Sequence, residues 1–337
     1  MPGRDPADDI RNLLSFDDFE HHSVTSRIRG RQGAEKLALT DYYRHSLLAP
    51  KSLWDGPMRE GFLDAAARHL GRQAGDRFVR KWLEVRGNAL RRERIVDPNV
   101  TPSLLQRLDV AICPVLRLPL THGYKSDSDW SVDRLNNDGA YAPGNLAIIS
   151  TLANRAKAHH CFADVYERGQ AAKGSGGLAP YEWMRIASLM VGPCFAEAPG
   201  AAPIVPMLAP LPISTVRSAT QIIQYALTIG TRSAADKNEL TKQLTRLYCD
   251  SHARAHICQV AELIHLALKT TAVIWDVWDS PRVMQAFLSM RASLPSHVWA
   301  AMGETAAHLA GGRPVARSTL GAWHLRTAGY FAESWRR

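Results

Sequence analysis

Four side chains that can bind a metal ion or a phosphate fall within one short stretch of the chain: Asp133, Asn145, Asn154 and Lys157. A carboxylate and an amide oxygen are ligands that a hard divalent cation takes from a protein. An amine on the same helix as the amide would meet the negative charge of a phosphate. These residue types predict a site that holds one divalent cation against a phosphate.

Local signals in the sequence place two strands and a turn around these residues. Apolar and polar side chains approximately alternate through 130–135, which is typical of a half-buried strand. The run Asn-Asn-Asp-Gly at 136–139 predicts a turn, because these residues tolerate a left-handed backbone or cap it locally. A β-branched run at 146–149 predicts the second strand, so the carboxylate of Asp133 is expected near the end of the first.

The helix expected after the second strand carries two of the four side chains. Thr151 can cap its first turn. Asn154 and Lys157 lie three residues apart and so share one helix face. A short connection from the strand would fold that face back toward Asp133.

The same stretch resembles the HNH, or ββα-metal, nuclease family, in the subgroup with an Asp-Arg core in place of Asp-His. The resemblance covers residues 109–160. The motifs that carry it occur in the family's order, and they are Ser131-Val132-Asp133-Arg134-Leu135, Gly139-x-Tyr141, Pro143-Gly144-Asn145-Leu146 and Asn154-x-x-Lys157.

This resemblance implies a metal-dependent endonuclease that hydrolyses phosphodiester bonds in DNA, with RNA as the alternative, in phage defence or a mobile element. It implies that Asp133 and Asn154 bind one divalent metal, Mg²⁺ first and Mn²⁺ as the alternative. It also implies that Asn145 ties the loop to the second strand, and that Lys157 lies near the scissile or a neighbouring phosphate.

One position departs from the usual family pattern, which places a general-base histidine directly after the metal-binding aspartate. Here that position is Arg134, whose guanidinium stays protonated at any useful pH. Three interpretations stay open. The base is a histidine elsewhere; a metal-bound water supplies the nucleophile while Arg134 clamps a phosphate; or the module binds nucleic acid without cutting it. The nearest candidate bases are His122, His159 and His160.

Each of these residues also has a purely structural interpretation. Asp133 and Arg134 would form an ion pair at the strand end, Asn145 would be a turn residue, and Asn154 would face solvent. For any one of these residues alone, the structural interpretation is the commoner one. The occurrence of all of them in the family's order favours a functional site. A third class of function is a helical interaction protein that keeps the core only as a remnant.

The five cysteines predict no structural zinc, because they are scattered and form no Cys-x-x-Cys pair. Cys113 with His159, His160 and Cys161 could approach one zinc ion, but their spacing matches no zinc pattern. Scattered cysteines and no signal peptide indicate a reducing, cytoplasmic setting. The longest apolar stretch, 260–278, is interrupted by charged residues and is too polar for a membrane span.

A net charge of +9 and a pI near 9.5 favour a polyanionic partner. The basic residues concentrate in one predicted helix just before the core, which would track a nucleic-acid backbone. The alternative is a solvated helix face with internal ion pairs such as Arg80 with Glu84. The side chains predicted to contact nucleic acid, DNA ahead of RNA, are Arg80, Lys81, Arg91, Arg92 and Arg94.

The whole pattern predicts a mainly α, multi-domain protein with a small ββα insert. The expected parts are a helical region with the basic helix at 1–107, the HNH-like core at 108–170, a linker with a short helix at 171–212, and a helical domain at 213–337. Amphipathic helices are expected at 36–48 and 58–70. The last domain offers a surface for a protein partner or self-association, and its expected helices are 215–230, 234–249, 252–275, 281–293, 296–310 and 318–335.

Overall fold

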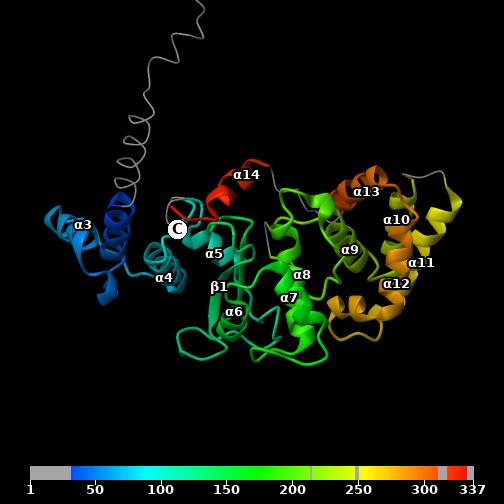
Figure 1. Ribbon diagram of the computed structural model, residues 1–337, viewed down its shortest axis with the longest axis horizontal. Helices are drawn as coiled ribbons and strands as arrows, with labels where there is room; N and C mark the ends of the chain where they lie inside the picture. The colour runs from blue at the N-terminus through cyan, green and yellow to red at the C-terminus, as the bar shows by residue number, and fades with distance from the viewer. Residues whose placement is uncertain (1–31, 213–214, 247–249, 310–316, 332–337) are drawn as a thin grey trace, which may run out of the picture. The chain divides into compact units, whose positions relative to one another are not determined.

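Figure 1 shows the computed structural model of the chain, which describes residues 32–212, 215–246, 250–309 and 317–331. Within these residues the protein is mainly helical and carries one antiparallel sheet of two strands, as expected for a mainly α class. The chain divides into two compact units. The first contains Met1–Val96, Thr101–Ser103 and Gly329–Arg337, and the second contains Asp97–Val100 and Leu104–Ala328.

The first unit is a set of helices around a small apolar core. Residues 32–44 are helical and are followed by the 3₁₀ helix η1 (Lys51–Leu53), α3 (Gly56–Ala67) and α4 (Arg77–Arg91). The two amphipathic helices predicted from the sequence are present, with their ends shifted toward the N-terminus. The start of the predicted N-terminal region, 1–31, lies outside the described residues. The buried core side chains include Leu39, Tyr42, Met58, Leu83 and Leu90.

Helix α4 is fixed at its start by Asp76, whose carboxylate accepts a hydrogen bond from the Val79 backbone N–H at 2.8 Å. Such an N-cap stabilises a helix by about 1 kcal/mol. Leu83 and Leu90 lie seven residues apart, which is close to two helical turns, so one stripe of α4 faces the core. The basic residues are therefore left on the other faces of the helix.

The sheet of the second unit is a hairpin of β1 (Trp130–Arg134) and β2 (Leu146–Ser150), preceded along the chain by α5 (Pro102–Leu108). The strands are antiparallel, with Val132 opposite Ile148 and Asp133 opposite Ala147. All of β2 is buried, because its Leu-Ala-Ile-Ile run is apolar on both faces and both faces are covered. Both strands lie where the alternation and the β-branched run predict them.

Helix α6 (Thr151–Lys157) begins directly after β2. The N-cap is Ser150, one residue earlier than predicted, and its Oγ accepts from the Ala153 N–H at 3.2 Å. The hydroxyl of Thr151 donates instead to the Asp129 carbonyl at 2.9 Å. Because no connecting residues separate strand from helix, α6 turns back and packs on both strands of the hairpin (Figure 1).

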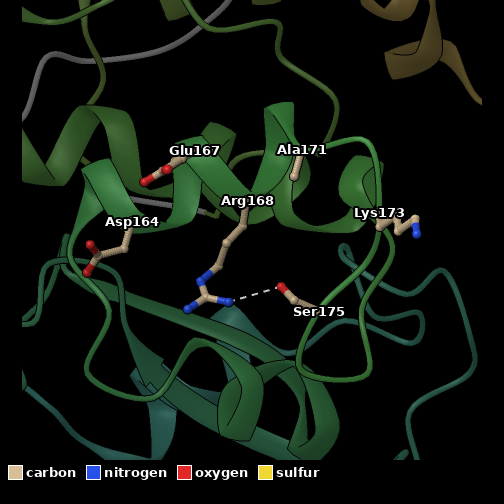
Figure 2. A pocket seen from close by; sticks show the side chains of 6 residues that line it. All are labelled: Asp164, Glu167, Arg168, Ala171, Lys173 and Ser175. Carbon is tan, nitrogen blue, oxygen red and sulfur yellow. Dashed lines mark hydrogen bonds between the residues drawn. The ribbon is translucent and has the colours of Figure 1, made fainter.

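Helices α7 (Phe162–Gln170) and α8 (Pro180–Cys194) follow and pack against each other. The exposed loop that joins them borders an open pocket of about 330 Å³ (Figure 2). Arg168 is braced at this pocket, since Nη1 donates to Ser175 Oγ at 3.0 Å and the guanidinium lies 5.2 Å from the ring centre of Trp183. The pocket is lined by Asp164, Glu167, Arg168, Ala171, Lys173 and Ser175.

The segment predicted as a linker, 171–212, is well packed over much of its length. Its helix α8 has 15 residues, and its side chains are almost all buried from Trp183 to Pro193. After the 3₁₀ helix η2 (Pro199–Ala201), the apolar side chains of Val205, Met207 and Leu208 are buried as well. Residues 104–328 form one compact unit, and the predicted domain boundary within it stays a prediction.

The rest of the second unit is helical, as the sequence predicts. Trp278, Phe287 and Trp299 pack edge to face in its core, with ring centres 5.0 and 5.6 Å apart. No helix among the described residues is long and apolar enough to cross a bilayer. The helices are α9 (Ala219–Gly230), α10 (Ala234–Thr245), α11 (Ser251–Leu268), η3 (Ile274–Asp279), α12 (Pro281–Ala292) and α13 (Ser296–Leu309).

The last predicted helix, 318–335, is wrong over its described part. The chain forms only the short helix α14 (Arg317–Gly321) and the 3₁₀ helix η4 (Leu325–Thr327). His324 and Ala328 have φ values of 51° and 49°, in the left-handed region, and this breaks the helical path on both sides of η4. The remaining predicted residues, 332–335, lie outside the described part of the chain.

Candidate functional site

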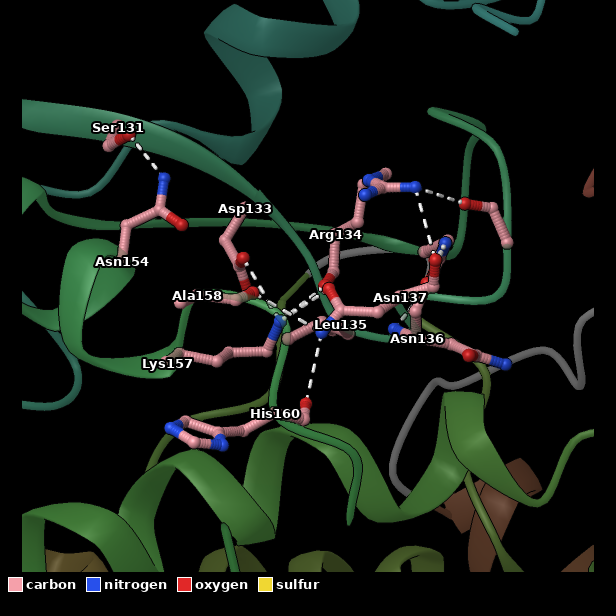
Figure 3. A network of polar contacts seen from close by, with 12 residues as sticks. Ser131, Asp133, Arg134, Leu135, Asn136, Asn137, Asn154, Lys157, Ala158 and His160 are labelled. Atoms are coloured by element: carbon pink, nitrogen blue, oxygen red, sulfur yellow. Dashed lines mark hydrogen bonds and ion pairs between the residues drawn. The ribbon is translucent and has the colours of Figure 1, made fainter. Parts of the chain in front are cut away.

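One face of the hairpin meets one face of α6, and the predicted site residues gather there. Successive side chains of a strand point to opposite faces, so Ser131 and Asp133 share a face of β1. Asn154 Nδ2 donates to Ser131 Oγ at 2.6 Å, and Lys157 Nζ donates to Asp133 Oδ1 at 3.1 Å. The structure therefore brings together Asp133, Asn154 and Lys157, as Figure 3 shows.

The carboxylate of Asp133 is buried, with 4% of the residue exposed. Oδ1 is paired with Lys157, whereas Oδ2 is buried without a hydrogen bond to any described residue. Burial raises the pKa of Asp133, because a charged carboxylate loses its hydration, and the Lys157 ammonium opposes this rise. Asp133 is thus committed to an internal ion pair and does not face open solvent.

Arg134 lies on the opposite side of β1 from Asp133. Its Nη1 donates to the carbonyls of Asn137 and Gly139 at 3.2 and 2.9 Å, and its guanidinium lies 5.0 Å from the ring centre of Tyr141. These contacts brace the turn that joins the two strands. The Arg134 side chain therefore forms no ion pair with Asp133 and does not lie beside it.

Asn145 is fully buried and closes the same turn. Its Oδ1 accepts from the Asn136 N–H at 2.7 Å, and its Nδ2 donates to the carbonyls of Asn136 and Ala140, both at 3.0 Å. A Cβ on Gly139 would lie 2.6 Å from Asn145 Nδ2, so only glycine fits there. Asn145 therefore holds the loop to the second strand and is not directed at a substrate.

The rings of the candidate histidine bases pack against other aromatic side chains. The ring of His122 packs edge to face on Trp130, with ring centres 5.1 Å apart, at the opposite end and on the opposite face of β1. His159 stacks on His160, whose ring contacts Trp183 beyond the end of α6. The sequence alone could not place these rings, because each belongs to a loop outside the hairpin.

Three residues that sequence reasoning missed support the site. Ser131 orients Asn154, and the Asn137 Oδ1 accepts from Lys157 Nζ at 3.1 Å. Trp323, far along the chain, is fully buried, donates from Nε1 to the Pro143 carbonyl and accepts from the Ala140 N–H. The strand period gives a signal for Ser131, since it falls on the face of Asp133, but nothing local predicts the contact of Trp323.

The side chains at this site make a poor set of metal ligands. A divalent cation such as Mg²⁺ would need oxygens from Asp133 and Asn154, and one carboxylate oxygen of that pair already binds an ammonium. No group of three or more His, Cys, Asp or Glu side chains in the described residues is placed to share a metal ion. Lys157 thus occupies one oxygen of Asp133, Oδ2 has no partner among the described residues, and the predicted Mg²⁺ or Mn²⁺ remains an untested prediction.

The cysteines considered for zinc lie in different environments. Cys113 is buried, and its Sγ accepts from the Ser150 N–H at 3.3 Å, whereas Cys161 is exposed at the start of α7. Cys249 lies outside the described residues. The predicted lack of structural zinc remains a prediction.

The basic residues predicted to bind nucleic acid divide into two groups. Arg80, Arg91 and Arg92 are exposed on α4 or directly after it, and Arg80 and Arg91 share a face because they are three helical turns apart. Lys81 pairs with Glu84, and Arg94 stacks on Tyr330 with its Cζ 3.7 Å from the ring centre. The first group therefore offers more charge to an outside partner than the second.

Comparisons of the chain with protein-family models, curated proteins and solved structures give no significant match.

Proposed function

We propose that this protein binds nucleic acid, DNA ahead of RNA, and that its hairpin and α6 form an HNH-like ββα core. The observation that supports the proposal is that Asp133, Asn154 and Lys157 lie on facing surfaces of the hairpin and α6. The buried tie made by Asn145 adds to the resemblance, because it holds the loop as the family pattern implies.

The geometry favours binding without cleavage. A carboxylate that holds a buried ammonium is poorly placed to accept a metal ion or a proton from water. Arg134 is engaged by loop carbonyls, and the ring of His122 is on the other face of β1. The exposed arginines Arg80 and Arg91 on α4, with Arg92 directly after it, supply positive charge for contacts to the phosphate backbone. Such contacts carry affinity without base specificity.

Metal-dependent endonuclease activity is the second candidate, and one observation favours it. Asp133 Oδ2 is a buried oxygen without a hydrogen bond to a described residue, which is unusual for a buried carboxylate. Residues that would hold the ion are Asp133 and Asn154. Such an ion would polarise a phosphodiester when bound.

A gel shift and a plasmid-nicking assay on the full chain separate the two candidates. Without divalent ions, wild-type protein should shift duplex DNA, and affinity should fall steeply with salt. Replacing Arg80 and Arg91 together by alanine should weaken binding and lower the salt slope by about 0.9 for each phosphate that is no longer neutralised. The matched control replaces Arg232 and Lys242, two exposed basic residues on and near α10.

Equal binding by the two double variants would contradict the role of α4. No shift with either duplex or single-stranded nucleic acid would sink the proposal as a whole. Nicking that appears only with Mg²⁺ or Mn²⁺, and disappears in Asn154→Ala, would make the endonuclease the correct function.

A further inference from the structure

The ammonium of Lys157 has all of its hydrogen-bonding capacity satisfied inside the ββα core. Nζ donates to Asp133 Oδ1 at 3.1 Å, to the Arg134 carbonyl at 2.7 Å and to Asn137 Oδ1 at 3.1 Å. An ammonium has three N–H donors, so none is left for an outside ligand. Figure 3 shows these partners converging on Nζ from β1 and the turn that follows it.

This ammonium is fully buried, with 0% of the Lys157 side chain exposed. Lysine is rarely buried completely, because removing a charge from water is costly unless a countercharge and hydrogen bonds replace the lost hydration. Asp133 supplies the countercharge, and two oxygens from the turn complete the set. The side chain therefore has the surroundings of a bound cation: a carboxylate, a carbonyl and an amide oxygen.

A second cation cannot share these oxygens at low cost. An ion on either oxygen of the Asp133 carboxylate would approach it to about 2.1 Å if it were Mg²⁺. An ion on Oδ1 would lie no farther from Nζ than that distance plus the 3.1 Å contact of Lys157, and an ion on Oδ2 would be bound to the same carboxylate as Nζ. Like charges so close in a buried site repel strongly, because protein screens them far less than water does.

We propose that the Lys157 ammonium is the resident cation of the ββα core and takes the place of a divalent metal at Asp133. Its charge offsets that of Asp133, and its other two donors hold the turn at Arg134 and Asn137. The statement that Lys157 replaces a metal rests on the proposed HNH-like function. The ion pair between Lys157 and Asp133 is independent of that function. If Lys157 fills this role, neither folding of the core nor binding of nucleic acid requires a divalent ion.

Thermal melts of the full chain with and without added metal test this idea directly. The wild-type melting temperature should be the same in EDTA, in MgCl₂ and in MnCl₂. Lys157→Met should melt at a lower temperature in EDTA, because it leaves Asp133 buried without its partner. Added Mn²⁺ should then raise the melting temperature of this variant, since the Asp133 carboxylate no longer binds an ammonium.

Calorimetric titration with Mn²⁺ gives the second measurement. Lys157→Met should bind Mn²⁺ on the order of tenfold more tightly than wild type, because a neighbouring like charge has been removed. Lys173→Met is the matched control, since Lys173 is exposed in the same unit, and it should behave as wild type. If Lys157 only filled space in the core, replacing it with methionine would not change the affinity for Mn²⁺.

The double variant Asp133→Asn with Lys157→Met guards against a failure to fold. Replacing both members of a buried ion pair with neutral groups is far less harmful than removing one. The double variant should therefore melt above Lys157→Met in EDTA and show no response to Mn²⁺. A double variant that is no more stable than the single one would show that the two side chains do not form a pair.

Two further results would overturn the proposal. One is a wild-type melting temperature that rises in Mg²⁺ or Mn²⁺ and loses this rise in Asp133→Asn. The other is a folded Lys157→Met that binds Mn²⁺ no better than wild type. The gel shift in EDTA is a separate measurement, so a protein that binds no nucleic acid would sink the proposed function and leave the melts to decide the role of Lys157.

Discussion

Replacing Asn145 with alanine should be among the most destabilising single changes in the ββα core. The side chain is fully buried and makes three hydrogen bonds to the turn, one accepted and two donated. Alanine removes all three and leaves the N–H and carbonyl of Asn136 and the carbonyl of Ala140 without these partners. The loop that Asn145 closes also carries the carbonyls that hold Arg134.

The size of the destabilisation follows from how well water can replace each bond. A buried polar group left without a partner costs about 1–3 kcal/mol. Ala140 is fully buried, so its carbonyl should cost near the top of that range, whereas Asn136 is only partly buried and its carbonyl keeps the hydrogen bond from the Gly139 N–H at 3.1 Å. The total is about 3 kcal/mol, which lowers the melting temperature of a unit of this size by about 6–12 °C.

Denaturant unfolding followed by tryptophan fluorescence measures this difference. Asn238→Ala is the matched control, because Asn238 is exposed on α10, and its stability should change by less than about 0.5 kcal/mol. If Asn145→Ala is no less stable than Asn238→Ala, the three hydrogen bonds do not stabilise the core. The assignment of Asn145 as the tie between loop and strand would then be wrong.

Three further predictions concern the same unit. Gly139→Ala should destabilise the core by about 1–3 kcal/mol, because the new Cβ would lie 2.6 Å from Asn145 Nδ2, and denaturant unfolding would show it. Burial alone would raise the pKa of Asp129, but hydrogen bonds from Thr121 Oγ1 and nearby backbone N–H groups lower it overall. The folded pKa lies below the unfolded one, so Asp129 stabilises the fold above pH about 4 and this contribution is lost as pH falls further. Melts across pH should show that loss, and Asp129→Asn should reduce it. Limited proteolysis should cut within the exposed residues 171–177 before the buried segment 205–211.

The hairpin and its helix could be predicted from the sequence because their signals are local. The turn residues at 136–139, the β-branched run of β2 and the hydroxyl at the start of α6 each fix a neighbouring stretch of backbone. The cap was misplaced by one residue, since Ser150 and Thr151 are both able to cap and only the backbone geometry decides between them. Local chemistry therefore gives the order of the elements and not the position of every cap.

The sequence predicts that the α6 face of Asn154 and Lys157 folds back toward Asp133, but the individual hydrogen-bond partners depend on how the elements pack. The purely structural interpretation of the sequence pairs Asp133 with Arg134, its neighbour in the chain. Strand alternation argues against this pair, because adjacent residues of a strand face opposite sides, and that signal was available from the sequence. The contact that forms instead reaches Lys157, 24 residues away, and depends on α6 folding back over the hairpin.

Composition is a weak guide to burial in the segment predicted as a linker. Proline and alanine are frequent in 192–212, which is typical of an extended arm, yet Val205, Met207 and Leu208 are buried. A few large apolar residues suffice to pack such a segment, because each gains about 1.5–3 kcal/mol from complete burial. Proline content alone is therefore a weak guide to exposure.

Three side chains of the core, Arg134, Asn145 and Lys157, bind the turn that follows β1. Arg134 binds the carbonyls of Asn137 and Gly139, Asn145 binds the backbone of Asn136 and Ala140, and Lys157 binds the side chain of Asn137. In an enzyme that depends on a metal, some of these groups would have to remain available to the ion and its substrate. Here their polar atoms fix the backbone. The response of the Lys157 variants to Mn²⁺ therefore decides between the proposed binding scaffold and a metal site.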